Sequence, residues 1–442
     1  MATSSGADSS RGFLGTLANI ERREWLAVLL SFALVFVLMS AYSMLRPVRD
    51  SLGGDWDNFG LAATWTVNFG VSLLAVSAYG AALTRIRFQS IVPAVYVFFS
   101  LTFVGLIALR SQLTGTVVVD MGFYVWISLF ALFNLSVFWS LMTDVFNPEQ
   151  AQRVFGFIAA GTTVGAILGP TITALFIDRL GANGLLLISA TLLLTPLFVV
   201  PALFRLKEST LGNAGHGGKH DIGKGLGKDW HAGFRILVKD PYLLGIAAFI
   251  LLYVTISTFV YFEIQTLTRE YDLEFRAKVW AWMDIATNSL TLIVAALVTG
   301  RIVQKFGMGV ALSIMPALVA VCVLALVAVP GLLLLGVFQI GRRVGNYALT
   351  RPAREMLFTT LSREARFKTK PIIDVVVYRG GDVISAWLFT ALVALTGMEL
   401  VGIALVICGI ATLWGGVAIW LGRRYEERSA SDPEPAAVAE PA

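Results

Sequence analysis

The chain alternates between long apolar runs and short polar segments. Each apolar run holds about twenty residues, the length that an α-helix needs to cross the hydrocarbon core of a bilayer. The pattern therefore predicts an all-α integral membrane protein with twelve transmembrane helices. The predicted spans are 25–52, 59–83, 90–109, 119–144, 153–177, 184–204, 241–266, 279–303, 309–329, 331–352, 371–395 and 399–422.

The longest internal polar stretch divides these spans into two sets of six. Residues 25–204 and 241–422 form the two apolar halves, and the connection 205–240 is rich in Gly and Lys. Gly-rich segments behave as flexible linkers. We expect a cytoplasmic segment at 1–24 and a disordered cytoplasmic tail at 423–442. Two six-helix halves around a polar loop resemble the major facilitator architecture, in which the halves rock about a site near the bilayer midplane.

Lys and Arg are distributed unevenly between the two sides of the predicted membrane. Most of the 34 basic residues fall on the side that carries both termini and the central linker. Cytoplasmic loops of membrane proteins carry this excess of positive charge. We therefore predict a multi-pass protein of the bacterial inner membrane with both termini in the cytoplasm.

Composition excludes several functional classes. The chain is 57% apolar and 14% charged, against 45–50% and about 25% in soluble domains. Its basic residues form no single stripe that would bind nucleic acid. The two cysteines show no metal-binding spacing, the three histidines all lie in the linker, and the P-loop pattern is missing. We expect no cofactor, no metal, no ATP hydrolysis and no enzymatic activity.

Charged residues inside predicted spans indicate function, because each costs about 2.5–3.5 kcal/mol on insertion scales. Tyr42, Arg46 and Arg49/Asp50 recur at helical spacing in the span 25–52, so they share one face. Two guanidinium groups on one face suit a phosphate or carboxylate, which Arg binds in a bidentate manner. We assign Tyr42, Arg46 and Arg49 to substrate binding and Asp50 to proton coupling or a latch. The alternative is a structural ion pair at a helix end.

Three further residues in the second half are candidates for substrate binding. Arg343 follows a mostly apolar stretch in the span 331–352, which places it near mid-membrane. Tyr378 and Arg379 lie in the span 371–395. Their alternative is an interhelical ion pair without contact to substrate.

Buried carboxylates within spans are candidates for proton coupling or for a latch. Asp374 and Asp382 lie on a polar stripe of the span 371–395, and Arg379 is close enough along the helix to pair with Asp382. Glu263 and Asp284 are single acidic residues in two other spans.

Small residues recur every four positions in the span 153–177. Gly161, Gly165 and Gly169, followed by Pro170, allow a second helix to approach closely. Together with Gly156, the pattern also resembles the fifth-helix motif of major facilitator antiporters and exporters. The closing glycine pair of that motif is absent, so helix packing is the favoured interpretation.

Three ordered segments resemble the ATP/ADP translocases of bacteria and plastids, nucleotide exchangers distantly related to the major facilitators. The segments are Leu45–Leu52, Pro352–Met356 and Lys368–Arg379. The resemblance implies the same scaffold and a cavity lined by Arg46, Arg49, Asp374 and Arg379.

Two departures from that family matter for the substrate. Asp382 stands where the exchangers usually carry a lysine just past the arginine, and Pro47 replaces an acidic residue. An anion in place of a cation is unfavourable for a substrate with three or four phosphate charges. The resemblance therefore does not secure ATP as the substrate.

The favoured function is a secondary active transporter of an organic anion, including nucleotides or other phosphorylated metabolites, by exchange or proton coupling. The alternative is a proton-driven exporter of amphipathic compounds such as drugs, siderophores or metabolites, which the 29 Phe residues favour. A membrane enzyme for lipid-linked substrates, or a membrane scaffold, is a third hypothesis. The expected partners are a small anionic molecule and the lipid bilayer, and we expect a monomer.

Overall fold

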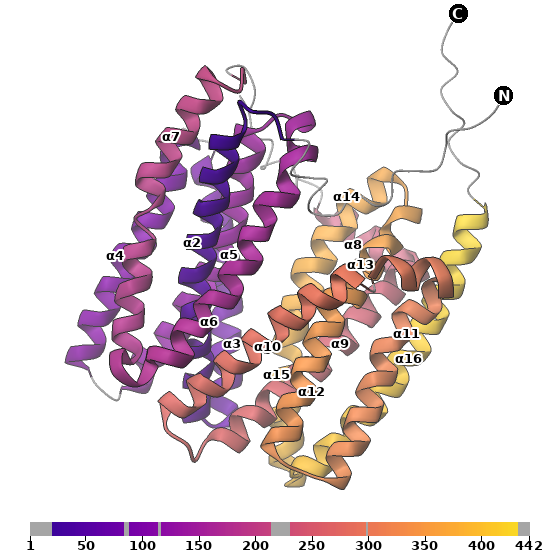
Figure 1. Ribbon diagram of the computed structural model, residues 1–442. Coiled ribbons are helices and arrows are strands. Elements are labelled where there is room, and N and C mark those ends of the chain that lie inside the picture. Colours follow the sequence, from indigo (N-terminus) through magenta and orange to yellow (C-terminus); the bar gives the residue numbers. More distant parts are fainter. Residues whose placement is uncertain (1–19, 84–87, 114–115, 214–229, 298, 432–442) are drawn as a thin grey trace, which may run out of the picture. The chain divides into compact units, whose positions relative to one another are not determined.

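The computed structural model describes residues 20–83, 88–113, 116–213, 230–297 and 299–431. Within these residues the chain is helical and contains no strand. The helices are α2 (Trp25–Leu52), α3 (Asn58–Leu83), α4 (Phe88–Gln112), α5 (Val117–Val145), α6 (Pro148–Leu192), α7 (Pro196–Ser209), α8 (Trp230–Lys239), α9 (Pro241–Thr268), α10 (Leu273–Leu297), α11 (Thr299–Ala328), α12 (Leu332–Gly345), α13 (Arg351–Leu357), α14 (Arg363–Pro371), α15 (Tyr378–Thr396) and α16 (Leu400–Ser431) (Figure 1).

The prediction of an all-α membrane protein with twelve spans in two sets of six is confirmed. Eight helical stretches of the described chain are by themselves long and apolar enough to cross a membrane. The stretch Pro148–Ser209 supplies two spans, because Gly181 takes a positive φ of 61° and breaks the helix there. The remaining predicted spans correspond to α10, α12 and α15; α12 is short, with 14 residues, and continues directly into the π-helical segment Asn346–Thr350.

Local sequence explains where two of the long helices begin. The Asn147 side chain accepts from the backbone N–H of Gln150, whose side chain accepts in return from Asn147, and Pro148 takes the first helical position. At the start of α9, the side chain of Asp240 similarly accepts from the backbone N–H of Tyr242, and Pro241 takes the first helical position. Such caps satisfy backbone groups that a helix end leaves unpaired.

The chain folds into two compact units. Unit 1 takes its described residues from Met1–Leu52, Val71–Asp221 and Leu273–Ile285. Unit 2 takes them from Gly53–Gly70, Ile222–Asp272 and Ala286–Ala442. The first turns of α3 therefore belong to unit 2, and the first half of α10 belongs to unit 1.

Two segments that the sequence predicts to be irregular are partly helical. Helix α16 continues to Ser431 instead of ending at 422, and Arg428 pairs with Asp240 at 2.8 Å. Within the linker 205–240, α7 reaches Ser209 and α8 forms a helix packed on α14. Residues 1–19, 214–229 and 432–442, which include most of the predicted terminal and linker segments, lie outside the described residues.

The core of unit 1 is built on α2, which packs extensively along α6. A Cβ atom on Gly161, Gly165 or Gly169 would lie 2.6–2.8 Å from a backbone oxygen of α2. Only glycine permits this approach. Pro170 follows within α6 and is buried with them.

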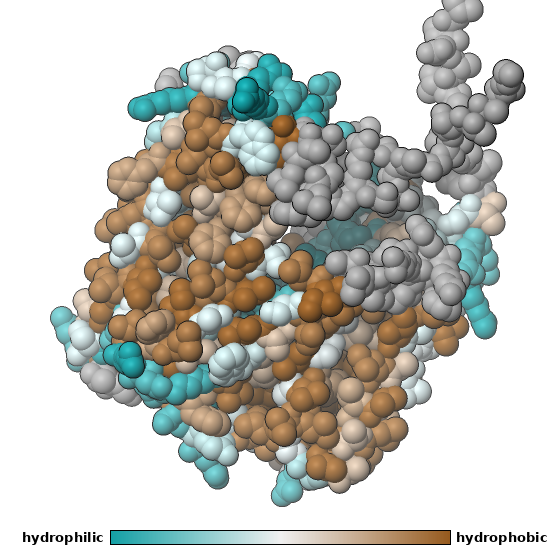
Figure 2. Space-filling model, viewed as in Figure 1, coloured by the Kyte–Doolittle hydropathy of each residue, from teal (hydrophilic) through white to brown (hydrophobic). Residues whose placement is uncertain are grey.

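The surface of the molecule matches a lipid environment. Figure 2 shows hydrophobic residues over most of the visible flank and hydrophilic residues near the helix ends. Leu395 is 85% exposed and Leu333 is 84% exposed. In water such surfaces promote association, whereas in a bilayer they face the acyl chains.

Candidate substrate-binding site

The last two turns of α2 hold an arginine pair around a buried carboxylate. Asp50 is 2% exposed. Its Oδ1 accepts from Arg49 Nε at 2.9 Å and from Arg49 Nη2 at 2.5 Å. Its Oδ2 lies 3.7 Å from Arg46 Nε. Both guanidinium groups therefore meet one carboxylate on the same helix face.

A second carboxylate reaches this cluster from α10, within unit 1. The Oδ2 of Asp284, which is also 2% exposed, lies 3.7 Å from Arg46 Nε. Removing a partner from a buried ion pair is strongly destabilising, because it leaves an uncompensated charge. Arg46, Arg49, Asp50 and Asp284 thus form a cluster with no net formal charge, which we call the α2 charge cluster.

Helix α5 supplies the polar and aromatic surroundings of the α2 charge cluster. Arg49 Nη1 donates to Ser128 Oγ at 3.3 Å, and Arg49 Cζ lies 5.2 Å from the centroid of the Tyr124 ring. Tyr42 packs edge-to-face on Phe130, with the ring centroids 6.2 Å apart. A guanidinium on an aromatic face gains cation–π attraction, so the orientation of Arg49 is well defined.

Helix α6 holds α2 in place just before the charges. Pro47 removes one backbone donor from α2. One turn earlier, Thr173 of α6 donates its hydroxyl to the Met44 carbonyl oxygen at 2.6 Å. Gly169 lies against the backbone at Ser40 and Met44. The arginines therefore project from a helix whose backbone is fixed by a close neighbour.

In unit 2, Arg342, which the sequence analysis does not assign to the site, makes well-defined hydrogen bonds. Arg342 donates to Gln339 Oε1 at 2.7 and 3.1 Å and to the Tyr253 hydroxyl at 3.0 Å. Arg343, the predicted binding residue, is also buried, at 4% exposed. The signal available in the sequence was Gln339, three residues before Arg342 on the same helix face.

Two of the segments that resemble the nucleotide exchangers meet in unit 2. Asp374 lies 3.5 Å from Arg354 and 3.4 Å from Lys370. Lys370 also pairs with Glu355, which lies 3.4 Å from Arg354. We call these four residues the α14 network. Asp374 lies within the π-helical segment Ile372–Val377, and a second π-helical segment, Asn346–Thr350, precedes α13. This geometry is frequent near functional sites.

The α14 network lowers the pKa of one of its members. Burial alone would raise the pKa of Glu355. The hydrogen bond from Lys370 and the charges of Lys370 and Arg354 outweigh burial, so the pKa lies below its ordinary value. The side chains of Glu355 and Asp374 are 43% and 33% exposed, so the network is hydrated.

The remaining predicted residues lie apart from both clusters. Arg379, 47% exposed, lies 3.9 Å from Asp382, and Tyr378 is partly buried beside them on α15. Glu263 on α9 is 5% exposed. Among the described residues, no hydrogen bond or ion pair to its carboxylate is found.

The predicted site residues thus divide between the units. Unit 1 brings together Arg46, Arg49, Asp50 and Asp284, with Tyr42 one turn earlier on α2. Unit 2 holds Arg343, Glu263, Asp374 and the Arg379–Asp382 pair with Tyr378. The described residues contain no group of three acidic, His or Cys side chains that would hold a metal ion.

The sequence model of the Major Facilitator Superfamily matches residues 128–350. No curated protein sequence matches the chain.

Several solved structures share the fold. One is a bacterial homologue of the iron transporter ferroportin in an inward-facing state, with 14% identity, a TM-score of 0.62, and 91% of this chain and 98% of that chain covered. A bacterial homologue of the human lysosomal transporter Spinster has 11% identity, a TM-score of 0.55, and coverage of 95% and 100%. The nucleoside transporter NupG has 12% identity, a TM-score of 0.58, and coverage of 92% and 99%.

At these identities, structural likeness shows the fold and leaves the substrate open. The family match spans just over half of the sequence. The helical architecture and the fold of the solved neighbours agree with it. The chain therefore belongs to the Major Facilitator Superfamily.

Proposed function

We propose that this protein is a secondary active transporter of an organic anion and that the anion binds the α2 charge cluster. The observation that carries the proposal is the meeting of Arg46 and Arg49 with two carboxylates that are each only 2% exposed. Ionisable groups at membrane depth are costly and mark substrate or ion pathways.

The α2 charge cluster can couple binding of the anion to a change of conformation. With two guanidiniums and two carboxylates it carries no net formal charge, which allows it to be buried. A phosphate or carboxylate of the substrate competes with Asp50 and Asp284 for the arginines. A displaced carboxylate then takes up a proton or forms another contact, so occupancy by the anion changes the internal ion pairs. Such a differential contact is what a ligand needs to shift a conformational equilibrium.

The α14 network is a less suitable anion site. Its two cations, Arg354 and Lys370, each contact acidic residues at both Glu355 and Asp374. The acidic members and Lys370 are partly exposed, and ion pairs that solvent reaches contribute about 0–1 kcal/mol. We assign the network a structural role in holding α13 against α14.

Phosphorylated metabolites, including nucleotides, are the proposed substrate class. Two arginines on one face suit a phosphate, and the resemblance of Leu45–Leu52 to the nucleotide exchangers supports the same choice. The proximity of Asp382 to Arg379 at 3.9 Å offsets positive charge there. ATP is therefore the first probe within the broader class of organic anions.

The test is uptake into proteoliposomes that contain the purified full-length protein. Vesicles are loaded with unlabelled ADP, and labelled ATP is supplied outside at neutral pH without a proton gradient. Saturable uptake that requires the internal ADP is the expected result.

Two arginine variants make this assay specific. Arg49→Gln removes a cation of the α2 charge cluster. Arg110→Gln is the matched control, because Arg110 also pairs with an aspartate, Asp120, at 3.3 Å and stacks on an aromatic ring, Phe123, at 5.0 Å. We expect Arg49→Gln to abolish uptake and Arg110→Gln to retain it.

The outcomes separate the candidate functions. Equal uptake by wild type and Arg49→Gln would contradict the assignment of the site. If neither labelled ATP nor labelled phosphate enters, the anion proposal fails for phosphorylated substrates. Efflux of an amphipathic dye that collapses with an uncoupler would then favour the exporter hypothesis.

A further inference from the structure

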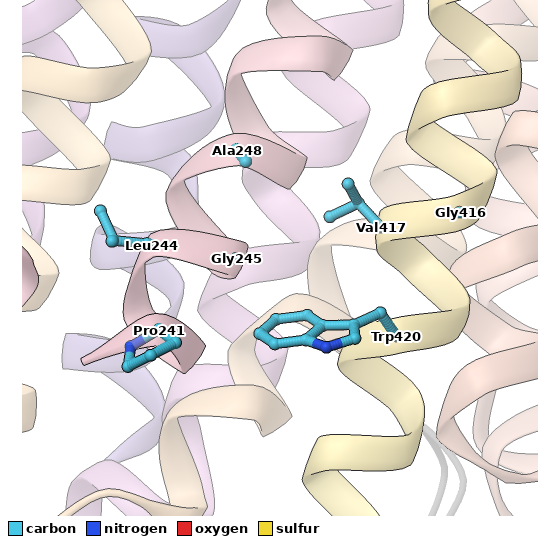
Figure 3. A pocket seen from close by; sticks show the side chains of 7 residues that line it. All are labelled: Pro241, Leu244, Gly245, Ala248, Gly416, Val417 and Trp420. Atoms are coloured by element: carbon cyan, nitrogen blue, oxygen red, sulfur yellow. The ribbon is translucent and has the colours of Figure 1, made fainter.

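An apolar groove runs along the outside of unit 2 between α9 and α16 (Figure 3). Its volume is about 430 Å³. Leu244, Gly245 and Ala248 line one wall, and Gly416, Val417 and Trp420 line the other. Leu244 is 42% exposed and Trp420 is 36% exposed, so the groove is open to the surroundings of the helix pair.

The groove forms where glycines leave space between the two helices. A Cβ atom on Gly416 would meet no atom within 4 Å, whereas one on Gly245 would lie 2.3 Å from the Trp420 ring. The indole therefore crosses from α16 to α9 and rests on the bare backbone of Gly245, as Figure 3 shows. From Pro241 to Ala248 the groove follows two turns of α9, about 10 Å at 1.5 Å per residue.

Basic residues follow the groove directly at one end. Arg424 lies one turn beyond Trp420 on α16, and its Cζ is 5.8 Å from the indole ring centroid. Arg423 is exposed beside it. The side chain of Arg424 is 54% exposed and that of its partner Glu427 is 63% exposed. Ion pairs between such exposed groups are weak, so a stronger anion can replace Glu427.

We propose that this groove, which we call the α9–α16 groove, binds an anionic phospholipid. One acyl chain lies along Leu244, Val417 and the face of Trp420, and the headgroup phosphate binds Arg424 and Arg423. A hydrophobic channel of two turns that ends in a tryptophan and then a pair of arginines matches the order of chain, interface and headgroup in a lipid.

The side of the membrane follows from the charges. Segments rich in Lys and Arg favour the cytoplasmic side, where anionic lipids attract them. Both residues at this end belong to the basic segment after the last span. The lipid is therefore one of the cytoplasmic leaflet.

The test measures lipid binding directly, independently of transport. The purified full-length protein in detergent is titrated with dioleoyl phosphatidylglycerol or dioleoyl phosphatidylcholine, and bound lipid is counted by native mass spectrometry. These lipids share their acyl chains and differ in headgroup charge. We expect one phosphatidylglycerol to be retained under conditions that remove phosphatidylcholine.

Two pairs of variants locate the site. Gly416→Leu places a side chain in the groove, and its Cβ meets no atom within 4 Å. Gly409→Leu is its control on the same helix, because a Cβ there also meets no atom within 4 Å. Gly416→Leu displaces at least two methylene contacts and should weaken binding about tenfold. Arg424→Gln should weaken it about fivefold. Its control is Arg23→Gln, an exposed arginine paired with Glu21.

Three results would overturn the proposal. Equal retention of the two lipids would show that headgroup charge does not contribute to binding. Binding that Gly416→Leu leaves unchanged would place the lipid elsewhere. A wild-type dimer that Gly416→Leu converts to a monomer would identify the occupant as a second copy of the chain.

Discussion

The first and fifth spans pack differently in the two halves of the sequence. In unit 1, Gly161, Gly165 and Gly169 of α6 face the backbone of α2, where a Cβ atom would come within 2.6–2.8 Å of a carbonyl oxygen. In unit 2, the corresponding pair is α9 and α15. There a Cβ atom on Gly381 would meet side chains, those of Leu251 and Val254, at 3.0 and 3.4 Å. Helix α2 is held by rigid backbone, and α9 by side chains that can adjust.

The α2 charge cluster and the α14 network differ in the same direction. The carboxylates of the α2 charge cluster are 2% exposed, whereas Glu355 and Asp374 of the α14 network have side chains 43% and 33% exposed. Charged groups are tolerated at membrane depth only with well-placed partners. The comparison indicates that unit 1 combines the close α2–α6 pair with a deeply buried charge cluster, which is the arrangement that a preorganised binding site requires.

The largest expected effect comes from removing one carboxylate in each unit. Asp50→Ala leaves Arg46 and Arg49 without their shared partner, and breaking a buried ion pair costs about 3–5 kcal/mol. Asp374→Ala breaks contacts that solvent screens, at about 1 kcal/mol or less. Thermal unfolding of the two purified variants in the same detergent measures the difference. Equal decreases in Tm would contradict the division between the two clusters.

An alanine scan of the glycines tests the packing contrast. Gly165→Ala places a methyl group 2.6 Å from the Phe36 carbonyl oxygen, and such overpacking costs about 1–3 kcal/mol. Gly381→Ala meets the side chains of Leu251 and Val254, at 3.0 and 3.4 Å, and gains up to about 1 kcal/mol of helix propensity. We expect Tm to fall for the first variant and to change little for the second. A stable Gly165→Ala protein would show that α2 and α6 can separate at little cost.

The smallest expected effect is the acid sensitivity of the α14 network. The pKa of Glu355 lies below its ordinary value of 4.5, so the ionised carboxylate stabilises the folded state. This contribution is complete above the ordinary pKa and is lost as the pH falls through the lower, folded-state pKa. Between pH 6 and roughly pH 3, a range that spans the ordinary pKa of a glutamate, Tm should therefore fall more steeply for wild type than for Glu355→Gln. If Tm fell equally with pH in both proteins, ionised Glu355 would contribute nothing to the stability of the folded state.

Much of the fold can be predicted from hydrophobic length alone. The first predicted span, 25–52, coincides with α2, and all twelve spans correspond to helices. The positions of helix breaks are harder to predict. Gly181 and Gly307 interrupt helices by taking positive φ angles of 61° and 79°, and the sequence contains many glycines that do not. Helix α16 passes its predicted end because its charged residues pair locally, as with Arg424 and Glu427 at 3.0 Å.

The α2 charge cluster could be predicted only in part. Helical spacing places Arg46, Arg49 and Asp50 on one face, because all three lie on one helix. The approach of Asp284 from α10 depends on tertiary packing, which spacing does not contain. The same limit explains why Arg342 was passed over, since its partner Tyr253 is 89 residues away.

The most direct test of the central claim compares the two clusters in one transport assay. Arg46→Gln/Arg49→Gln removes two positive charges from the α2 charge cluster, and Arg354→Gln/Lys370→Gln removes two from the α14 network. Both proteins are reconstituted with equal amounts of folded protein, and ADP-dependent uptake of labelled ATP is measured. The proposed site predicts no saturable uptake for the first variant and a KM close to wild type for the second. Saturable uptake by the first variant, together with loss of uptake in the second, would contradict this prediction. It would indicate that the anion binds the α14 network in unit 2.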